Sequence, residues 1–484
     1  MSVPDHFDLI VIGSGPAGEK GAAQAAYFGK RVCLIERAPK PGGAAVNTGT
    51  IPSKTLRETA LYFSGLRQRG LYGVDLSVKQ NITISDFMHR ERAVIESEWA
   101  LIAENIEKHG IYTIQGSARL VNDRTVEITR YGLEPRQITG DTILVATGSS
   151  PMAPVGYEVD GEVIVDSDSL LTLQRIPASM IVVGGGVIGC EYACIFAALG
   201  VRVTVVNARA RLLAHLGHDV SDALRQSMTA KLGISVLGNV EVQDVAVDNG
   251  RAHVTLSDGI VLSADCVLVS TGRIGNSTQL GLAEVGVRCN DRGFIQVDSH
   301  YRTAVPNIYA AGDVIGFPAL ASASMEQARV AVCHAFDLKY KTAVSDVMPY
   351  GVWTIPEIAT VGESEDELYA RGVAYEIGRS SFRMNPRGQI LGDVEGFVKI
   401  IFHREDQRVL GVTIVGETAC ELIHVGMTVI AFGGTLDFFI QAAFNFPSLA
   451  DAYKYAAYDG LQRLQRRHAR MPGLPSLARE VVPE

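Results

Sequence analysis

Residues 8–36 read DLIVIGSGPAGEKGAAQAAYFGKRVCLIE, and this stretch decides the fold of the N-terminal part of the chain. It begins with a continuous apolar run typical of a buried parallel strand, turns at Gly13 and Gly15, and continues as a helix of small residues. A second predicted strand over 31–35 ends in Glu36. The pattern therefore predicts a strand, a crossover helix and a second parallel strand.

Each glycine of this stretch has its own role in binding a dinucleotide. Gly13 permits the tight turn, Gly15 lets a pyrophosphate approach the backbone, and Gly18 lets the helix pack closely on the strand. The helix N-terminus presents free N–H groups and the positive end of its dipole to the phosphates. Glu36 lies 21 residues after Gly15, where its carboxylate would accept hydrogen bonds from a ribose.

A second unit of the same kind occupies residues 178–213, which read ASMIVVGGGVIGCEYACIFAALGVRVTVVNARARLL. Gly184, Gly186 and Gly189 stand between a predicted strand and a predicted helix, and Gly200 ends that helix. One such unit alone fits a tight strand-to-helix turn in another kind of α/β protein. Two units in one chain favour two dinucleotide sites.

The two units differ at the position that faces the ribose. Asn207 stands where the first unit has Glu36, and Arg209 and Arg211 follow within four residues. A carboxylate would repel a 2′-phosphate, whereas an amide repels neither ribose form and a guanidinium pairs with the phosphate. We therefore predict that the second site accepts NADP and also NAD. The alternative is that both arginines are solvated loop charges.

Two further stretches end a strand in a glycine turn, ILVATGSSP at 143–151 and LVSTGRIGN at 268–276. We interpret them as crossing points, so that the second nucleotide unit is inserted into the first domain. Asp313 then stands at the end of a predicted apolar strand and precedes a predicted helix over 320–336, an arrangement that suits a polar cofactor chain. An ordinary helix cap is the alternative for Asp313. From about residue 347, alternating segments predict antiparallel strands with added helices.

The composition is that of a globular protein with several cores. The chain has 484 residues, of which 47% are hydrophobic, and it is too long for one core. A formal net charge of −9 argues against a broad nucleic-acid surface. The N-terminal apolar run ends at glycines and is too short for a signal peptide or a membrane span. We expect a cytoplasmic protein without nucleic-acid or membrane partners.

The seven cysteines are an odd number scattered over the chain, which favours reduced thiols. Cys190 and Cys194 are four residues apart on a predicted helix, and we interpret them as small core residues instead of a redox pair. The sequence predicts no metal site.

Residues 42–54 read GGAAVNTGTIPSK and resemble the active-site segment of the FAD-dependent pyridine nucleotide-disulfide oxidoreductases, such as lipoamide dehydrogenase and glutathione reductase. Ala45 and Thr50 stand where those enzymes carry two redox cysteines. Near the C-terminus, Phe446 stands where they carry the histidine that handles thiol protons. Because the sulfurs and the base are both absent, we predict chemistry that ends at the flavin.

This resemblance covers nearly the whole chain and implies a fold class. The fold is α/β, with two Rossmann-like dinucleotide-binding domains, one for FAD and one for NAD(P), and a C-terminal α+β dimerisation domain. The implied boundaries are 1–153 and 281–346 for the FAD-binding domain, 154–280 for the NAD(P)-binding domain, 347–466 for the dimerisation domain and 467–484 for a loosely packed tail.

The resemblance also implies site residues. Lys54 and Glu191 match a pair beside flavin N5, where the cation would stabilise reduced flavin and the carboxylate would neutralise the cation; these are the predicted catalytic residues. The predicted cofactor-binding residues are Gly13, Gly15, Pro16, Gly18, Glu36, Arg37, Gly42, Gly43, Thr50, Lys54, Gly116, Ala118, Thr147, Gly148, Gly184, Gly186, Val187, Ile188, Gly189, Glu191, Asn207, Arg209, Gly272, Arg273, Gly312 and Asp313.

Within the superfamily, NTGTIPSKTLRE at 47–58 and FNFPSLADAYKYAA at 444–457 resemble the soluble, Si-specific NAD(P)+ transhydrogenases. That group keeps a cysteine at the position of Ala45. The resemblance implies ping-pong hydride transfer between NADPH and NAD+ through flavin N5, without a redox disulfide, in a homodimer or higher homo-oligomer. Two alternatives are an NAD(P)H dehydrogenase or diaphorase that reduces a quinone or oxygen, and a non-enzymatic relative of the disulfide reductases.

Overall fold

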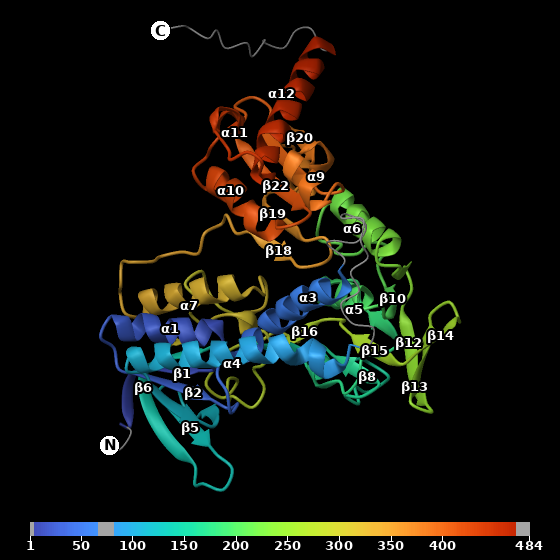
Figure 1. The fold of residues 1–484 in the computed structure, drawn as a ribbon. Coiled ribbons are helices and arrows are strands. Elements are labelled where there is room, and N and C mark those ends of the chain that lie inside the picture. Colours follow the sequence, from blue (N-terminus) through green and yellow to red (C-terminus); the bar gives the residue numbers. More distant parts are fainter. Residues whose placement is uncertain (1–3, 66–81, 471–484) are drawn as a thin grey trace.

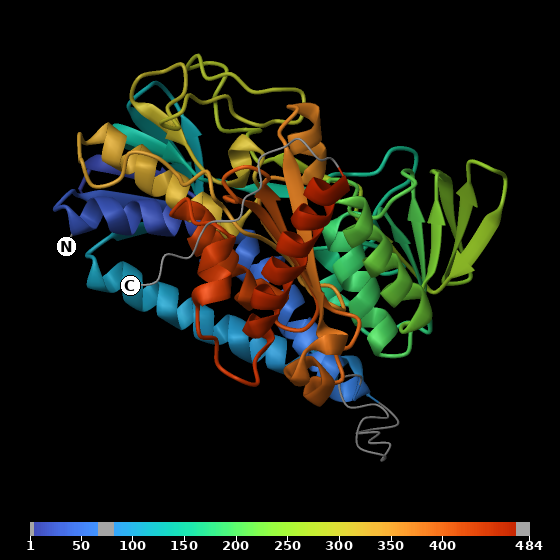
Figure 2. The same cartoon turned by 90° about the horizontal axis from the view of Figure 1, so that it is seen from above.

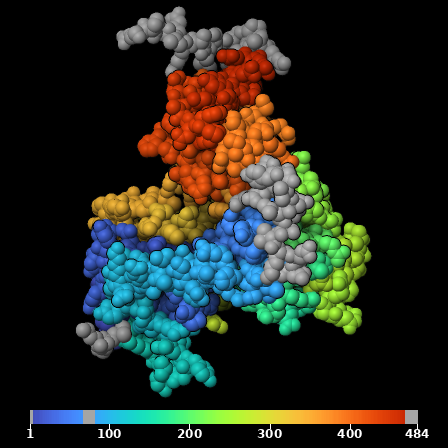
Figure 3. Space-filling model, viewed as in Figure 1, coloured from blue at the N-terminus to red at the C-terminus, as the bar shows by residue number. Residues whose placement is uncertain are grey.

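The computed structural model describes residues 4–65 and 82–470. Three bodies, each built on its own large sheet, make up the molecule (Figure 1). The first and second bodies lie side by side, and the third, formed by the C-terminal part of the chain, stands over the junction between them (Figure 2). The space-filling view shows the third body projecting from the other two (Figure 3).

The first body contains a seven-stranded sheet. Its strands are β1 (His6–Ile12), β2 (Val32–Glu36), β3 (Tyr112–Gln115), β4 (Ser117–Leu120), β5 (Thr125–Thr129), β6 (Arg136–Val145) and β17 (Ile308–Ala310). Their order is β3-β2-β1-β6-β5-β4, and β17 also pairs with β6. β1, β2, β3, β6 and β17 are parallel, whereas β4 and β5 form an antiparallel extension. A strand from much later in the chain thus joins the first sheet.

Both faces of this sheet are covered, which explains the continuous apolar run in β1. Leu9 and Val11 pack with helices on one face, and Ile10 and Ile12 pack with the β4–β5 extension and the segment 280–297 on the other. The helices of this body are α1 (Pro16–Tyr27), α2 (Gly43–Asn47), α3 (Thr50–Ser64), α4 (Ile84–Lys108) and α7 (Ala321–Ala335). α1 lies between α4 and α7 (Figure 1).

The second body contains an all-parallel sheet. Its strands are β8 (Ile164–Asp166), β9 (Ser179–Val183), β10 (Arg202–Asn207), β11 (Ser235–Gly238) and β15 (Cys266–Val269), in the order β11-β10-β9-β15-β8. Its helices are α5 (Val187–Ala198) and α6 (His218–Ala230). An antiparallel sheet of β12 (Val242–Asp248), β13 (Arg251–Leu256) and β14 (Val261–Ala264) is attached to it.

The two glycine turns that the sequence marks as crossing points lie next to each other. β7 (Ser149–Pro151) and β16 (Arg273–Gly275) follow these turns and form a short antiparallel pair between the first and second bodies. Both passages of the chain therefore run through one narrow connection.

The third body is α+β, as its alternating sequence predicts. Its antiparallel strands are β18 (Tyr350–Val352), β19 (Ile358–Gly362), β20 (Tyr375–Ser381), β21 (Phe397–His403) and β22 (Val409–Val415), in the order β18-β19-β22-β21-β20. Its helices are α8 (Glu365–Ala370), α9 (Pro386–Leu391), α10 (Ala419–Ala431), α11 (Leu436–Gln441) and α12 (Ala452–Arg470). No helix among the described residues is long and apolar enough to cross a membrane.

Some local expectations differ from the structure. Asp313 does not end a strand, because β17 ends at Ala310 and Asp313 begins a short 3-10 turn, Asp313–Ile315, well before α7. It is not the cap of α7 either, because the N-cap of that helix is Leu320. The tail predicted from residue 467 begins within α12, and 471–484 lie outside the described residues.

Candidate functional site

One continuous cavity of about 1960 Å³ runs along both glycine turns. A pocket for one small ligand usually spans about 300–1000 Å³, so this cavity has room for two dinucleotides. All predicted site residues line it except Gly18, Gly42 and Gly189. Gly18 and Gly189 lie instead where their helices touch the preceding turns: an added Cβ would meet the carbonyl oxygens of Gly13 and Gly184 at 1.8 and 2.1 Å.

The carboxylate of Glu36 fixes the conformation of the first glycine turn through hydrogen bonds. Gly13 has a φ of +102°, in the region that favours glycine, and Gly15 is the N-cap of α1, with Pro16 as its first residue. The carboxylate of Glu36 accepts the backbone N–H and the hydroxyl of Ser14 at 2.8 and 2.6 Å. The N-terminus of α1 therefore faces the cavity from a fixed loop.

The second glycine turn repeats this geometry. Gly184 has a φ of +112°, and Gly186 is the N-cap of α5. A Cβ at Gly186 would meet no atom within 4 Å, and one at Gly15 would meet only the Cα of Gly43, at 3.8 Å. The space that these two side chains would fill borders free N–H groups at both helix N-termini. The two turns thus fit the phosphate groups of two dinucleotides, FAD and NAD(P).

Asn207 does more than replace a carboxylate. Its Oδ1 accepts the backbone N–H of Gly185 at 3.1 Å, as Glu36 does from Ser14 in the first turn. Its amide group also donates to the carbonyl oxygens of Arg209 and Arg211 at 2.7 and 3.0 Å. A carboxylate has no protons for these two bonds. Asn207 therefore shapes the loop that displays the arginines.

The arginine loop contains further features that the sequence did not reveal. The backbone N–H of Leu213 donates to the carbonyl oxygen of Gly185 at 2.9 Å. Leu213 has a φ of +45°, which is a strained conformation for a bulky residue. A Cβ on Gly185 would overlap Asn207 at 2.7 Å. Among the described residues, Nη1 of Arg211 is buried without a hydrogen-bond partner, whereas Arg209 is exposed. Both arginines line the cavity.

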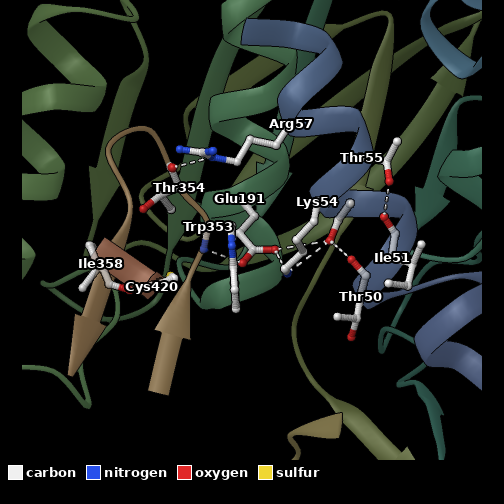
Figure 4. A network of polar contacts seen from close by, with 11 residues as sticks. Thr50, Ile51, Lys54, Thr55, Arg57, Glu191, Trp353, Thr354, Ile358 and Cys420 are labelled. Carbon is white, nitrogen blue, oxygen red and sulfur yellow. Dashed lines mark hydrogen bonds and ion pairs between the residues drawn. The ribbon is translucent and has the colours of Figure 1, made fainter. Parts of the chain in front are cut away.

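Lys54 and Glu191 meet where α3 of the first body approaches α5 of the second (Figure 4). The Lys54 ammonium lies 2.8 Å from Oε2 of Glu191 and 3.2 Å from the hydroxyl of Ser53. The other carboxylate oxygen of Glu191 accepts the backbone N–H of Trp353 at 2.9 Å. Glu191 is only 3% exposed, so this pair is a compensated charge inside the cavity wall.

Trp353 is a cavity residue that the sequence did not point to. The ammonium of Lys54 lies 4.7 Å from the centre of its indole ring, within the range of a cation–π contact. Trp353 belongs to the third body and follows β18, so all three bodies contribute to this part of the cavity.

Other lining residues also escaped sequence reasoning because no motif marks them. Burial raises the pKa of Asp168, and the guanidinium of Arg273 opposes that shift. Burial and the charge of Arg209 lower the pKa of His215. Both causes favour the neutral form of the His215 imidazole. Asp168 and His215 both line the cavity.

The two crossing points are connected by polar contacts. Arg273 donates to the hydroxyl and the carbonyl oxygen of Ser149 at 2.8 and 2.6 Å, and this hydroxyl donates to Asp313 at 3.0 Å. The hydroxyl of Thr147 donates to the carbonyl oxygen of Asn276 at 2.7 Å. These contacts bring three predicted site residues, Arg273, Asp313 and Thr147, to one wall of the cavity.

Comparisons with known proteins agree with this geometry. The family model for pyridine nucleotide-disulphide oxidoreductases matches residues 7–335, and the model for their dimerisation domain matches residues 348–457. The chain belongs to the pyridine nucleotide-disulphide oxidoreductase family. Membership confirms the predicted fold class and the use of FAD with nicotinamide dinucleotides.

Relatives in this family match over nearly their full lengths. The soluble pyridine nucleotide transhydrogenase of Mycobacterium bovis is 41% identical over 461 residues, which cover 95% of this chain and 98% of the relative. That of Yersinia pestis is 38% identical, with coverages of 95% and 99%. Among solved structures, LpdA from Mycobacterium tuberculosis superposes with a TM-score of 0.86 at 30% sequence identity. The match covers 93% of this chain and 99% of the LpdA chain.

This member of the disulphide oxidoreductase family has no cysteine thiol among the described residues that line its cavity. Ala45 and Thr50 line the cavity, and no cysteine among the described residues does so. Burial raises the pKa of Cys194 to about 12 and that of Cys190 well above its usual range, and both thiols lie on α5 and are fully buried in the core. Phe446 is 74% exposed and does not line the cavity of this single chain, so the predicted apolar wall over the flavin stays a prediction about the dimer.

Proposed function

We propose that the chain is an FAD-dependent, Si-specific soluble pyridine nucleotide transhydrogenase that transfers hydride reversibly between NADPH/NADP+ and NADH/NAD+. Bound FAD would supply the redox chemistry by taking hydride from one dinucleotide and returning it to another, in a ping-pong order. The observation that carries this proposal is the Lys54–Glu191 ion pair in the wall of a cavity without a cysteine. The names of relatives at 38–41% identity support it.

The residues around the cavity have distinct proposed roles. The first glycine turn would hold the FAD pyrophosphate, with Glu36 at the ribose, Gly116 and Ala118 near the adenine, and Asp313 at the ribityl chain. All four line the cavity. The ammonium of Lys54 would stabilise the negative charge of reduced flavin, and Glu191 would keep the ammonium oriented and compensated.

The second glycine turn would accept either nicotinamide dinucleotide. A 2′-phosphate would meet the loop of Arg209 and Arg211, whereas a free ribose would meet the neutral amide of Asn207. One site can then serve both halves of a ping-pong cycle. Arg211 supports this role because its Nη1 is buried without a partner among the described residues.

The proposal also assigns domain boundaries, an oligomeric state and a compartment. The FAD-binding domain would comprise 1–153 and 281–346, the NAD(P)-binding domain 154–280, and the dimerisation domain 347–466. The dimerisation-domain match at residues 348–457 supports a homodimer. The seven cysteines form no disulfide, which supports a reducing compartment such as the cytoplasm.

The decisive experiment is transhydrogenation from NADPH to thio-NAD+ by the purified, FAD-loaded protein. Anaerobic stopped-flow reduction by NADPH, followed by mixing with NAD+ or with a quinone, identifies the preferred oxidant. We expect NAD+ to reoxidise the flavin faster than the quinone or oxygen. A faster quinone reaction would identify a diaphorase instead, and a colourless protein that takes up no FAD would identify a non-enzymatic relative.

A further inference from the structure

Arg57 is a buried cation directly behind the proposed reaction site. It lies on α3 three residues after Lys54, is only 1% exposed, and is the largest fully buried side chain among the described residues. Burying a guanidinium is costly unless its donors are satisfied, so its partners indicate what it holds in place.

The partners of Arg57 lie mainly in the third body. Its Nε donates to the carbonyl oxygen of Thr354 at 3.0 Å, and its Nη1 lies 3.2 Å from a carboxylate oxygen of Glu357. A third contact, at 2.6 Å, joins Nη1 to Glu58, the next residue on α3. Glu357 is itself buried, and its second oxygen accepts the backbone N–H of Cys420 at 3.2 Å. Arg57 thus connects α3 to the segment 353–357 between β18 and β19.

The same segment begins with Trp353, which contacts both members of the proposed catalytic pair. Its backbone N–H donates to Glu191 (Figure 4). The ammonium of Lys54 lies over its indole ring. The carbonyl oxygen that receives Arg57 belongs to the very next residue, Thr354. A shift of this segment would therefore move the hydrogen-bond donor of Glu191 and the aromatic wall beside Lys54 together.

We propose that Arg57 is a positioning residue for the reaction at the flavin. By fixing Thr354 and Glu357, it holds Trp353 in the place where its N–H orients Glu191 and its ring confines the Lys54 ammonium. Arg57 does not touch the cavity itself, since it is absent from the cavity lining. This inference rests on the proposed function, because it assigns Arg57 to the pair that would act on the flavin.

The test uses variants that leave no buried charge unpaired. The double variant Arg57→Met/Glu357→Gln removes both charges at similar volume, and Trp353→Leu removes the indole but keeps the backbone N–H. We expect FAD-loaded protein of both kinds to show a more negative flavin midpoint potential, because the cation that stabilises reduced flavin is less confined. The rate of flavin reduction by NADPH should fall on the order of tenfold, as for a small misplacement of reacting groups.

Lys399→Met is the matched control. Lys399 is also a buried cation that connects two bodies, since its ammonium lies 2.9 Å from Asp219 of α6 and 2.8 Å from Glu365, and it does not line the cavity. Its loss should lower thermal stability and leave the flavin potential and the reduction rate unchanged. Arg57→Lys keeps a cation and should recover part of the potential shift.

Two results would overturn the proposal. One is an FAD-loaded double variant with wild-type flavin potential and reduction rate. If that variant does not fold, the result that overturns it is wild-type potential and rate in both Trp353→Leu and Arg57→Lys. These readouts need only NADPH and bound FAD, so they are independent of whether NAD+ reoxidises the enzyme. Failure of transhydrogenation by the wild-type protein would instead contradict the proposed function.

Discussion

The ammonium of Lys54 lies 2.8 Å from a carboxylate oxygen of Glu191, although the two residues are 137 positions apart in the chain. Lys54 is on the first turns of α3 and Glu191 is on α5, just after the second glycine turn. The ion pair therefore exists only when the first and second bodies are docked. It lies in the wall of the cavity that passes both glycine turns, where a flavin and a nicotinamide would meet.

We expect Lys54→Met to slow flavin reduction by NADPH by on the order of 100-fold, because a preorganised charge near the reacting atoms is lost. The dissociation constant of NADPH should change little, since Lys54 does not lie in the arginine loop. Stopped-flow reduction measures both quantities. Lys20→Met is the matched control, because Lys20 also pairs with a buried glutamate, Glu19, but does not line the cavity. A wild-type reduction rate in Lys54→Met would refute the role of Lys54.

Charge reversal in the arginine loop should change nucleotide selectivity. In Arg209→Glu, the carboxylate repels a 2′-phosphate, so the KM for NADPH should rise by at least about tenfold while that for NADH stays within about twofold. Arg202→Glu is a suitable control because Arg202 is exposed at the opposite end of β10. Equal losses for both nucleotides would show that Arg209 does not read the phosphate.

Asn207→Asp should destabilise the arginine loop and also add a negative charge beside it. The substitution keeps an acceptor for Gly185 but sets a carboxylate against the carbonyl oxygens of Arg209 and Arg211, at 2.7 and 3.0 Å from the atom it replaces. Leaving buried polar groups unpaired costs about 1–3 kcal/mol, so the free energy of unfolding should fall by that amount. Urea denaturation measures it, and KM values for both nucleotides report selectivity. If the variant keeps its free energy of unfolding but loses selectivity for NADPH, the added negative charge alone explains the effect, and the amide hydrogen bonds do not stabilise the loop.

The sequence predicted the parts of the site that regular patterns encode. Glycines at fixed offsets between an apolar strand and a small-residue helix specify a local backbone, and Gly184 and Gly186 adopt it. The roles of Arg57 and Trp353 could not be predicted, because the partners that define them lie in other bodies and far away in the sequence. The role of Gly185 could have been predicted from the sequence. It is the middle residue of three consecutive glycines, which suggests that another group approaches the backbone closely, and the side chain of Asn207 does so.

The position of Asp313 shows a second kind of limit. Its apolar strand and the following helix were predicted, but the 3-10 turn between them was not, since short turns carry little hydrophobic pattern. The apolar wall that the sequence predicts at Phe446 involves a second subunit, and it stays a prediction about the dimer.

Two alanine substitutions in the second glycine turn should have opposite consequences. Gly189→Ala places a Cβ at 2.1 Å from the carbonyl oxygen of Gly184, so α5 must move and we expect a stability loss of about 1–3 kcal/mol. Gly186→Ala meets no atom within 4 Å, so the protein should keep its stability. Its methyl group would occupy the proposed phosphate position and raise the KM of NADH and NADPH alike. Thermal unfolding and steady-state kinetics test the pair, and normal KM values in Gly186→Ala would contradict the phosphate site.

Thiol chemistry provides the last prediction. Cys289 is exposed, whereas the other six cysteines are buried, and burial raises the pKa of Cys194 to about 12. At pH 8 the thiolate of Cys194 is therefore negligible, and only Cys289 should react quickly with iodoacetamide in the native protein. Mass spectrometry should find one rapidly modified thiol per chain, and none in Cys289→Ser. Transhydrogenation should survive alkylation both before and after reduction by NADPH, because no cysteine thiol lines the described part of the cavity. Inactivation only after reduction would place a thiol in the electron path and contradict chemistry that ends at the flavin.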